Sequence, residues 1–217
     1  MPASDMFFPK LARRKEYSTK HDGSYYEYTH YRQEIRQDSL GRCVYCDSHE
    51  NEIGGQETME LDHFRPRKYR LHYHLVNDPT NLVWSCRGCN NLKRDHWPAL
   101  GTDSSIRDNE GFVDPFYDNR ADFFRVESDG ELVALKPPAQ YMIGLLVLNR
   151  ISRQRQRENR IIRQELIQEL DHQAQLLRDT LTTELSKCQR DNLEEALNVN
   201  ASIRDLIVVR FLDFSLR

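Results

Sequence analysis

The sequence predicts an α+β fold in which a small zinc-stapled unit is followed by a helical extension. Two observations predict it. Two Cys-x-x-Cys pairs flank a short strand-like stretch in the first half of the chain, and a long helical pattern follows Pro137-Pro138. With 217 residues, 38% of them hydrophobic and 30% charged, the composition is that of a folded, rather polar protein and not of a disordered one.

The first half of the chain is expected to contain a helix, a short strand and a second helix. A helix is expected over residues 25–40 because its apolar side chains lie roughly on one face, and Gly41 is placed to end it. The stretch "TMELD" alternates like a strand that ends at Asp62. The stretch "NNLKRDHW" has a helical pattern that Pro98 would end.

The second half of the chain is expected to contain a β-hairpin and then helices. "FFRVESDGELVAL" has the pattern of a hairpin whose turn is Asp129-Gly130. Residues 141–181 show one long helical pattern, and an apolar stretch, "DLIVVRFLDF", follows near the end. We therefore expect three segments: an N-terminal helical segment at 1–39, the zinc-stapled unit at 40–112, and the hairpin with the helical extension at 113–217.

Four of the five cysteines form two Cys-x-x-Cys pairs, Cys43/Cys46 and Cys86/Cys89. In each pair a single turn lets both thiolates face one ion, and four thiolates suit a structural Zn²⁺. The alternatives are four buried or redox-active cysteines, or one metal-binding pair and one coincidental pair, but a reducing compartment favours metal over disulfides. Cys188 lies far from both pairs and is expected to be a buried core thiol.

The net charge of −3 argues against non-specific binding of nucleic acid, but the charge is unevenly distributed. Residues 62–96 contain seven Lys and Arg against three Asp, and residues 150–163 contain six Arg against one Glu. This arginine series either follows a nucleic-acid backbone or covers an exposed helix face, and both alternatives stay open. No apolar run approaches the ~20 residues of a membrane span and no signal peptide is recognisable, so we expect a cytoplasmic protein.

The stretch between the cysteine pairs carries a recognisable motif. "LDHFRP" and "NLVWSCRGCNNLK" combine a D-H-x-x-P element, a central N-L pair and a C-x-x-C-N-x-x-K element. Over roughly residues 40–98 this order resembles the ββα-metal motif of the HNH endonucleases, with Asn90 at a position where members have His or Asn. The resemblance implies a metal-dependent hydrolase of phosphodiester bonds in nucleic acid, with DNA favoured over RNA as the substrate.

The resemblance assigns roles to individual residues. His63 would be the catalytic general base, which suits a side chain whose pKa lies near neutrality, and Asn81 would support catalysis by bracing the loop that carries it. Asp62 and Asn90 would supply the oxygen ligands that a catalytic Mg²⁺ or Mn²⁺ prefers. Without the motif, an Asp-His pair is more often a surface turn, and Asn81 would be a helix cap.

Basic side chains around the motif are expected to contact the phosphate backbone of nucleic acid: Arg65, Arg67, Lys68, Arg70 and Lys93. The alternative for Arg65 to Arg70 is a solvated face. Four histidines are expected at the surface, with the second or third of them beside the groove: His49, His72, His74 and His96. Trp84 and Trp97 are expected in the core rather than stacked on bases.

A looser likeness continues through "VDPFYDNRADFFRVESDGELV" and "LLVLNRISRQRQR". This longer pattern resembles the HNH proteins of retron and Septu anti-phage systems, in which the nuclease subunit works beside an ATPase. It implies an ATPase partner, docked by the acidic helices of residues 164–217. Two other functions stay open: a zinc-stapled nucleic-acid-binding module without catalysis, and a subunit that mainly docks a partner.

Overall fold

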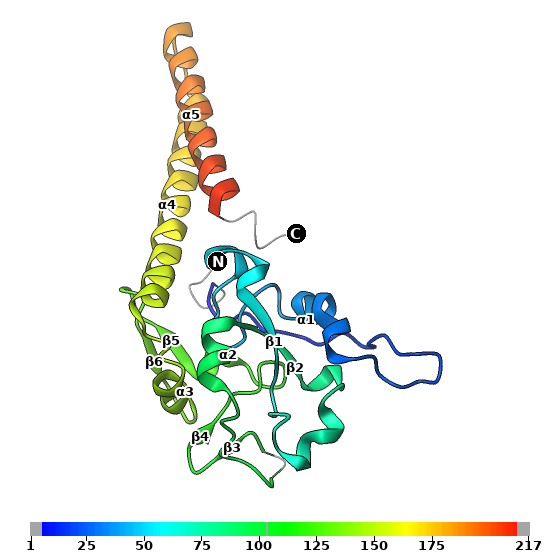
Figure 1. Cartoon of the computed structure of the whole chain (residues 1–217). Helices are drawn as coiled ribbons and strands as arrows, with labels where there is room; N and C mark the ends of the chain where they lie inside the picture. Colours follow the sequence, from blue (N-terminus) through cyan, green and yellow to red (C-terminus); the bar gives the residue numbers. More distant parts are fainter. Residues whose placement is uncertain (1–5, 103, 212–217) are drawn as a thin grey trace. The chain divides into compact units, whose positions relative to one another are not determined.

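The computed structural model describes residues 6–102 and 104–211, with side chains up to residue 208 (Figure 1). It combines helices with small antiparallel sheets, which confirms the expected α+β class. The chain divides into two compact units after Arg157, and helix α4 (Ile151–Leu181) runs across the division. The N-terminal segment, the motif region and the hairpins all belong to the first unit.

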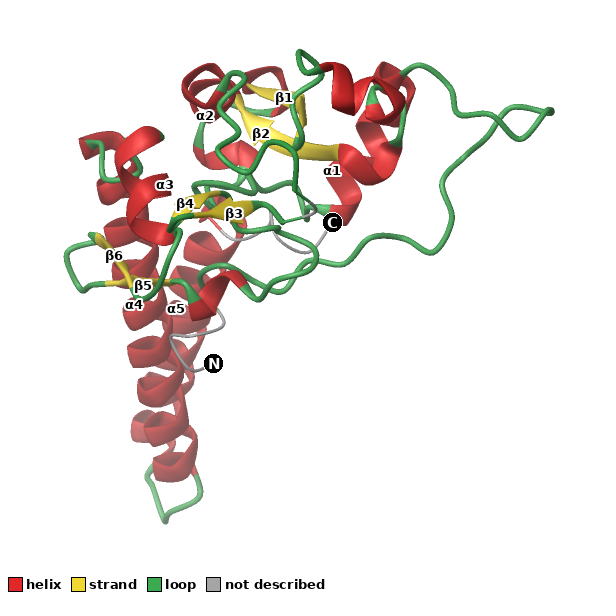
Figure 2. Ribbon diagram, turned by 90° about the horizontal axis from the view of Figure 1, so that it is seen from below, coloured by secondary structure: helices red, strands yellow, loops and turns green. Residues whose placement is uncertain are grey.

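The first unit is built around two strands and a helix that follow one another in the motif region. Strand β1 (Met59–His63) pairs antiparallel with β2 (Leu82–Cys86), and α2 (Arg87–Lys93) follows β2 directly (Figure 2). The register places Asp62 and His63 at the end of β1, opposite the first residues of β2. The strand expected from "TMELD" is therefore present, with its end one residue later.

Helix α2 is shorter than the sequence predicts. It ends at Lys93 rather than near Pro98, because Arg94 adopts a left-handed backbone conformation with a φ of 48°. Its start is capped by Cys86, whose sulfur accepts a hydrogen bond from the backbone N–H of Cys89 at 3.4 Å. A cysteine of the second pair thus marks the boundary between β2 and α2.

The core of the first unit lies between β2 and helix α1 (Arg32–Asp38). All five residues of β2 are buried, and Trp84 at its centre and Ile35 of α1 have no exposed surface. The helix expected over residues 25–40 is present only in its second half, and a 3-10 turn at Tyr28–Tyr31 precedes it. Burial of apolar side chains around β2 is the main stabilisation of this unit.

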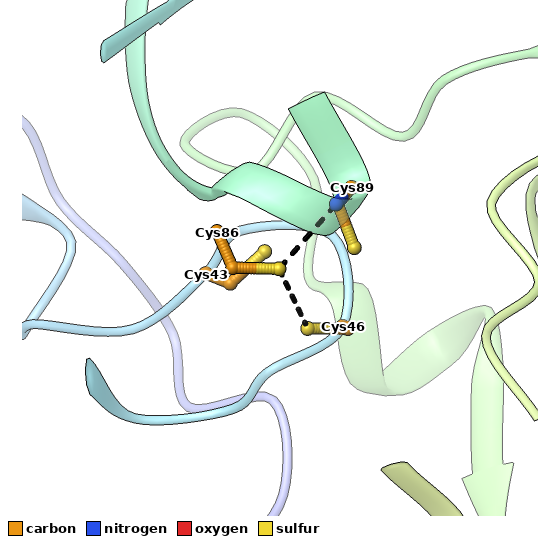
Figure 3. A group of neighbouring side chains, drawn as sticks. All are labelled: Cys43, Cys46, Cys86 and Cys89. Atoms are coloured by element: carbon orange, nitrogen blue, oxygen red, sulfur yellow. Dashed lines mark hydrogen bonds between the residues drawn. The ribbon is translucent and has the colours of Figure 1, made fainter. Parts of the chain in front are cut away.

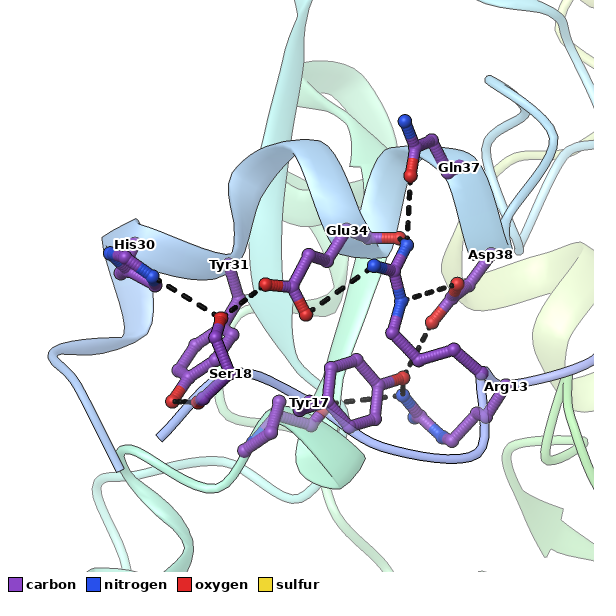
Figure 4. A network of polar contacts seen from close by, with 10 residues as sticks. Arg13, Tyr17, Ser18, His30, Tyr31, Glu34, Gln37 and Asp38 are labelled. Atoms are coloured by element: carbon purple, nitrogen blue, oxygen red, sulfur yellow. Dashed lines mark hydrogen bonds and ion pairs between the residues drawn. The ribbon is translucent and has the colours of Figure 1, made fainter. Parts of the chain in front are cut away.

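The residues ahead of α1 are fastened to it by a polar network (Figure 4). Arg14 pairs with the Asp38 carboxylate at 3.0 Å, and the Tyr17 hydroxyl donates to the other oxygen of that carboxylate at 2.6 Å. The hydroxyl of the buried Tyr31 donates to the backbone carbonyl of Ser18 at 2.8 Å. The extended N-terminal segment is therefore held against the unit that carries the motif.

Two further two-stranded sheets complete the first unit. Strand β3 (Ile106–Arg107) pairs with β4 (Glu110–Gly111), and β5 (Phe124–Val126) pairs with β6 (Leu132–Ala134). The second pair confirms the expected hairpin, and Gly130 in its turn has a φ of 81°, which glycine adopts without strain. Short 3-10 turns connect the elements: Glu50–Glu52, Gln56–Thr58, Arg70–Leu75, Pro79–Asn81 and Arg120–Asp122.

The long helical pattern after Pro138 is divided between two helices. Helix α3 (Ala139–Leu145) ends shortly before Val147, whose φ of 47° turns the chain, and α4 begins at Ile151. Leu146 and Leu148 in the connection are fully buried. Burial of these two side chains outweighs the helical propensity of the segment, so one continuous helix over residues 141–181 does not form.

The second unit consists of the later part of α4 and of α5 (Lys187–Phe211). Ile167 and Ala174 of α4 and Asn200 of α5 are buried, and Asn200 Nδ2 donates to the Leu170 carbonyl at 3.2 Å. The expectation that Cys188 is a buried core thiol is wrong: it lies exposed near the start of α5, because two paired helices bury only a narrow stripe of residues.

Among the helices that the structure describes, none has both the length and the apolar character needed to cross a membrane. The end of the apolar stretch "DLIVVRFLDF" lies outside the described residues.

Candidate functional site

The two cysteine pairs converge into one buried cluster (Figure 3). Cys43 and Cys46 lie in a turn that is joined to β2 by a hydrogen bond from Val44 N–H to the Trp84 carbonyl at 3.0 Å. Cys86 ends β2, and Cys89 lies in the first turn of α2. The four sulfur atoms lie within 4.8 Å of one another.

The geometry of this cluster fits a tetrahedral zinc ion. Zinc–sulfur distances of ≈ 2.3 Å correspond to sulfur–sulfur separations of about 3.8 Å in a tetrahedron. The sulfurs of Cys46 and Cys86 are 3.8 Å apart, and all four cysteines are free thiols rather than disulfides. Hydrogen bonds from the neighbouring cysteines hold the pKa of Cys86 far below its ordinary value, which favours the thiolate that binds metal.

The first arginines of residues 150–163 fit neither expected alternative. They neither follow a nucleic-acid backbone nor cover an exposed helix face. Arg150 and Arg153 direct their guanidinium groups at the cysteine sulfurs. Arg157 is buried and donates to the backbone carbonyls of Gly130 at 2.6 Å and Leu148 at 3.1 Å. These three side chains therefore hold parts of the first unit together.

A pocket of about 270 Å³ opens beside the end of β1. Asp62 and His63 line it from β1, and Asn90 lines it from α2. The structure thus brings together three of the residues that the motif singles out. The remaining lining comes from the following residues: Tyr28, Leu61, Pro66, Arg67, Lys68, Arg94 and Asp95.

The His63 imidazole has a defined orientation in this pocket. Its Nε2 lies 2.9 Å from the Val76 carbonyl oxygen, and since a carbonyl only accepts, Nε2 carries the proton. The lone pair of the neutral ring therefore lies on Nδ1. Tyr28 packs against the ring with a centroid distance of 4.9 Å, and burial lowers the pKa of His63.

Asn81 braces the segment that follows His63. Its Oδ1 accepts from the backbone N–H of Arg65 at 2.9 Å, and its Nδ2 donates to the carbonyl of the same residue at 3.1 Å. The Asn81 carbonyl also accepts from the Phe64 N–H at 2.8 Å. Asn81 is absent from the residues that line the pocket, so the geometry gives it a positioning role rather than direct contact with a substrate.

Asp62 is buried in a polar cage of its own. The Tyr45 hydroxyl donates to Oδ2 at 2.6 Å, and Lys93 Nζ lies 3.1 Å from Oδ2 and 3.3 Å from Oδ1. Lys93 Nζ also donates to the His63 carbonyl at 3.0 Å. An ionised carboxylate offers about four lone-pair sites and these contacts use three, which leaves one for a ligand in the pocket.

Asn90 offers its amide oxygen as a further atom that could bind a metal ion. Its Nδ2 donates to Glu60 Oε2 at 2.8 Å, which fixes the orientation of the amide. Asp62 and Asn90 both line the pocket, and hard divalent ions such as Mg²⁺ bind carboxylate and amide oxygens. The donor chemistry therefore fits the expected catalytic cation.

Of the residues expected to contact the backbone of nucleic acid, two line the pocket and two others do not. Arg67 and Lys68 are exposed and line the pocket, where Lys68 pairs with Asp95. Arg65, whose guanidinium lies 5.9 Å from the centre of the Trp97 ring, and the exposed Arg70 are not among the lining residues.

Lys93 differs from the expectation. Its side chain has no exposed surface, because its ammonium group neutralises the buried Asp62 and is enclosed by Tyr45 and Phe112. A phosphate group cannot reach a side chain that is buried in this way. Contrary to the expectation, Lys93 therefore holds Asp62 in place and does not contact the backbone of nucleic acid.

Among the pocket residues that were not expected from the sequence are Arg94 and Tyr28. Arg94 follows Lys93 at the end of α2, and its exposed charge is signalled only by its place in the basic stretch. Tyr28 comes from the turn ahead of α1, far from the motif in sequence, so no local pattern indicates it.

The expectations for histidines and tryptophans have mixed outcomes. His74 and His96 are exposed, but the expected surface positions of His49 and His72 are wrong, since both are buried. Both have polar partners: the ring of His72 donates from Nδ1 to the Pro66 carbonyl at 3.0 Å, and His49 caps a 3-10 turn. Trp84 and Trp97 are confirmed as core residues.

Comparison with known proteins agrees with the geometry of this region. Residues 43–96, which lie in the first unit, match the family model of the HNH endonucleases. No curated protein and no solved structure matches the chain. The match supports a nuclease, and with it binding of nucleic acid.

The cluster predicts one zinc ion per folded chain. Cys86→Ser should abolish zinc retention and lower solubility, because metal binding at such sites supplies folding free energy on the order of 10 kcal/mol. Elemental analysis of the purified protein measures the zinc. Cys188→Ser, which changes an exposed cysteine outside the cluster, is the matched control and should retain one zinc. Zinc-free, folded wild-type protein would disprove the prediction.

The burial of Lys93 predicts a large loss of stability on substitution. Lys93→Ala leaves the buried Asp62 carboxylate without its countercharge, which should lower the free energy of unfolding by about 3 to 5 kcal/mol. Urea denaturation measures this change. Lys68→Ala, at a 70% exposed side chain that lines the pocket, should change it far less, because water already screens its charge. Equal effects of the two substitutions would contradict the anchoring role of Lys93.

Proposed function

We propose that the protein is a metal-dependent endonuclease that hydrolyses phosphodiester bonds in nucleic acid. The observation that carries this proposal is the pocket in which His63 stands beside two oxygen donors, Asp62 and Asn90. A general base and a cation site within one pocket are the two groups that hydrolysis of a phosphodiester needs.

In the proposed reaction His63 acts as the general base. Nδ1 carries the lone pair and takes a proton from the water that attacks phosphorus. The resulting imidazolium keeps its Nε2–H hydrogen bond to the Val76 carbonyl, which holds the ring in place while the charge develops. Asn81 acts through His63, because its hydrogen bonds to the backbone of Phe64 and Arg65 fix the segment that follows the histidine.

Asp62 and Asn90 would hold Mg²⁺ or Mn²⁺. Such an ion, when bound, supplies positive charge for the phosphate oxygens in the transition state. The exposed side chains of Arg67, Lys68 and Arg94 add positive charge along the pocket and suit contacts to the neighbouring phosphates. DNA is proposed as the preferred substrate on the resemblance to the HNH endonucleases alone, so both DNA and RNA belong in the test.

We further propose that this nuclease is the effector of an anti-phage defence system and works with an ATPase. The resemblance to the nuclease subunits of retron and Septu systems motivates this role. A docking surface for a partner is supported by the second unit, where apolar side chains form two exposed rows on α4 and α5. Their members are between 45 and 56% exposed: Ile162, Leu166, Leu176, Val199, Ile203 and Leu206.

The two rows lie on the same face of the helical hairpin. At about 100° per residue, Ile162, Leu166 and Leu176 fall within one sector of about 80° on α4, away from the buried Ile167 and Ala174, and the exposed Glu169 and Gln173 lie in the same sector. The row on α5 lies on the same side of its own buried stripe, and the helices are antiparallel. Apolar side chains gathered on one side of an exposed helix pair are a feature of surfaces that pack on another protein.

Nuclease activity is predicted to depend on His63. With Mg²⁺ or Mn²⁺ present, the protein should cleave plasmid DNA or RNA, and His63→Ala should reduce the rate by roughly 10²–10⁴-fold because the base is lost. Gel analysis of the products measures cleavage. His74→Ala, at an exposed histidine outside the pocket lining, is the matched control.

Both variants should keep their zinc, so that a loss of activity reports on the base and not on folding. Cleavage by His63→Ala at the wild-type rate would contradict the proposed mechanism. Binding of nucleic acid without cleavage, with the ATPase absent and present, would instead favour the catalytically inactive binding module.

Complex formation is predicted with the proposed ATPase partner, which is to be sought among the products of the neighbouring genes. Co-expressed, the two proteins should elute together in size-exclusion chromatography, and Leu166→Glu should separate them because it places a charge in the apolar face. Gln168→Glu introduces the same charge on another face of α4 and should leave the complex intact. Separate elution of the wild-type proteins would disprove the docking proposal without affecting the nuclease proposal.

A further inference from the structure

Two arginines at the start of α4 lie beside the cysteine cluster: Arg150 directly precedes the helix, and Arg153 lies in its first turn. Arg150 Nη2 lies 3.8 Å from Cys89 Sγ and 3.9 Å from Cys86 Sγ, and Arg153 Nη2 lies 3.6 Å from Cys86 Sγ. Both guanidinium groups therefore reach the sulfur of Cys86. Both belong to the first unit, as does the cluster.

The other hydrogen bonds of these two arginines go to neutral groups. Arg150 otherwise donates to the carbonyls of Leu146 and Val147, and Arg153 to the amide oxygen of Gln156. In the part of the chain that the structure describes, neither guanidinium forms an ion pair with a carboxylate, and Arg153 Nε is buried without a hydrogen-bond partner. Partly buried cations are stable only beside compensating negative charge, so the sulfurs have to supply it.

The backbone beside the cluster leaves room for this contact. Gly88 lies between Cys86 and Cys89, and a Cβ atom at this position would lie 3.4 Å from Arg150 Nη2. This distance is an ordinary van der Waals contact, so Arg150 lies directly against the backbone of the "CRGC" turn.

We propose that Arg150 and Arg153 are the charge partners of the zinc-loaded cluster and couple its metal content to the attachment of α4. Zn²⁺ with four thiolates formally carries two excess negative charges, which the two guanidinium groups balance. Zinc affinity then depends on both arginines. In turn, loading of the cluster holds the first turns of α4 against the segments that carry the cysteines.

The first test measures zinc affinity by competition with a chromogenic chelator. Arg150→Gln and Arg153→Gln should each weaken zinc binding by roughly 10-fold or more, as substitutions beside metal ligands commonly do. Arg155→Gln removes the same charge from an exposed position of the same helix and should leave affinity unchanged. Arg150→Lys keeps the charge and should retain more affinity than Arg150→Gln.

The second test measures hydrogen exchange over residues 147–157 with zinc kept saturating. The Arg150→Gln/Arg153→Gln double variant should lose protection there relative to Arg155→Gln, while β2 stays protected. Affinity and protection equal to those of Arg155→Gln would overturn the proposal, and so would equal losses in Arg150→Lys and Arg150→Gln. Neither measurement depends on nuclease activity, so its outcome is independent of the proposed function.

Discussion

The convergence of four cysteine sulfurs at the junction of β2 and α2 is the constraint on which the rest of the first unit depends. Cys86 ends the strand and Cys89 lies in the first turn of the helix, so the cluster fixes the angle at which α2 leaves the sheet. Asn90 follows Cys89 directly, so the place of Cys89 in the cluster also fixes the position of Asn90. On the other strand, the register places Asp62 and His63 within reach of α2. A small sheet of two strands would be marginal without such a fixed point.

A buried ion pair completes this arrangement at the last residue of α2. Lys93 binds both Asp62 and the carbonyl of His63, so the helix is attached to β1 at two residues that line the pocket. Burying two charges is costly in free energy, and their attraction offsets this only with good geometry and further hydrogen bonds. Tyr45 provides one of these bonds from the turn between the first two cysteines. Tyr45 thus links the turn of the cysteine cluster to Asp62, which lines the pocket.

The sequence allowed the motif residues to be identified, but it did not indicate most of the residues that contact them. His63 and Asn90 were expected to face one site, and both line the same pocket. Lys93 was assigned to phosphate because its spacing from Cys89 says nothing about burial, whereas its fully buried side chain pairs with Asp62. Arg150 and Arg153 were read as either a binding surface or a solvated face, because their partners are sulfurs more than sixty positions away in the chain. Contacts of this kind have no local signature.

What the sequence determined by itself is the set of features that depend on short spacings. The two Cys-x-x-Cys turns, β1, the hairpin at Gly130 and the α+β class all follow from patterns within a few residues, where backbone geometry is decided by neighbours. The tertiary structure alone decided where α2 ends, where the long helical pattern breaks at Val147, and which basic side chains are buried. It also brought Tyr28 against His63. These outcomes depend on which distant surfaces meet, because burial and charge pairing act through space and not along the chain.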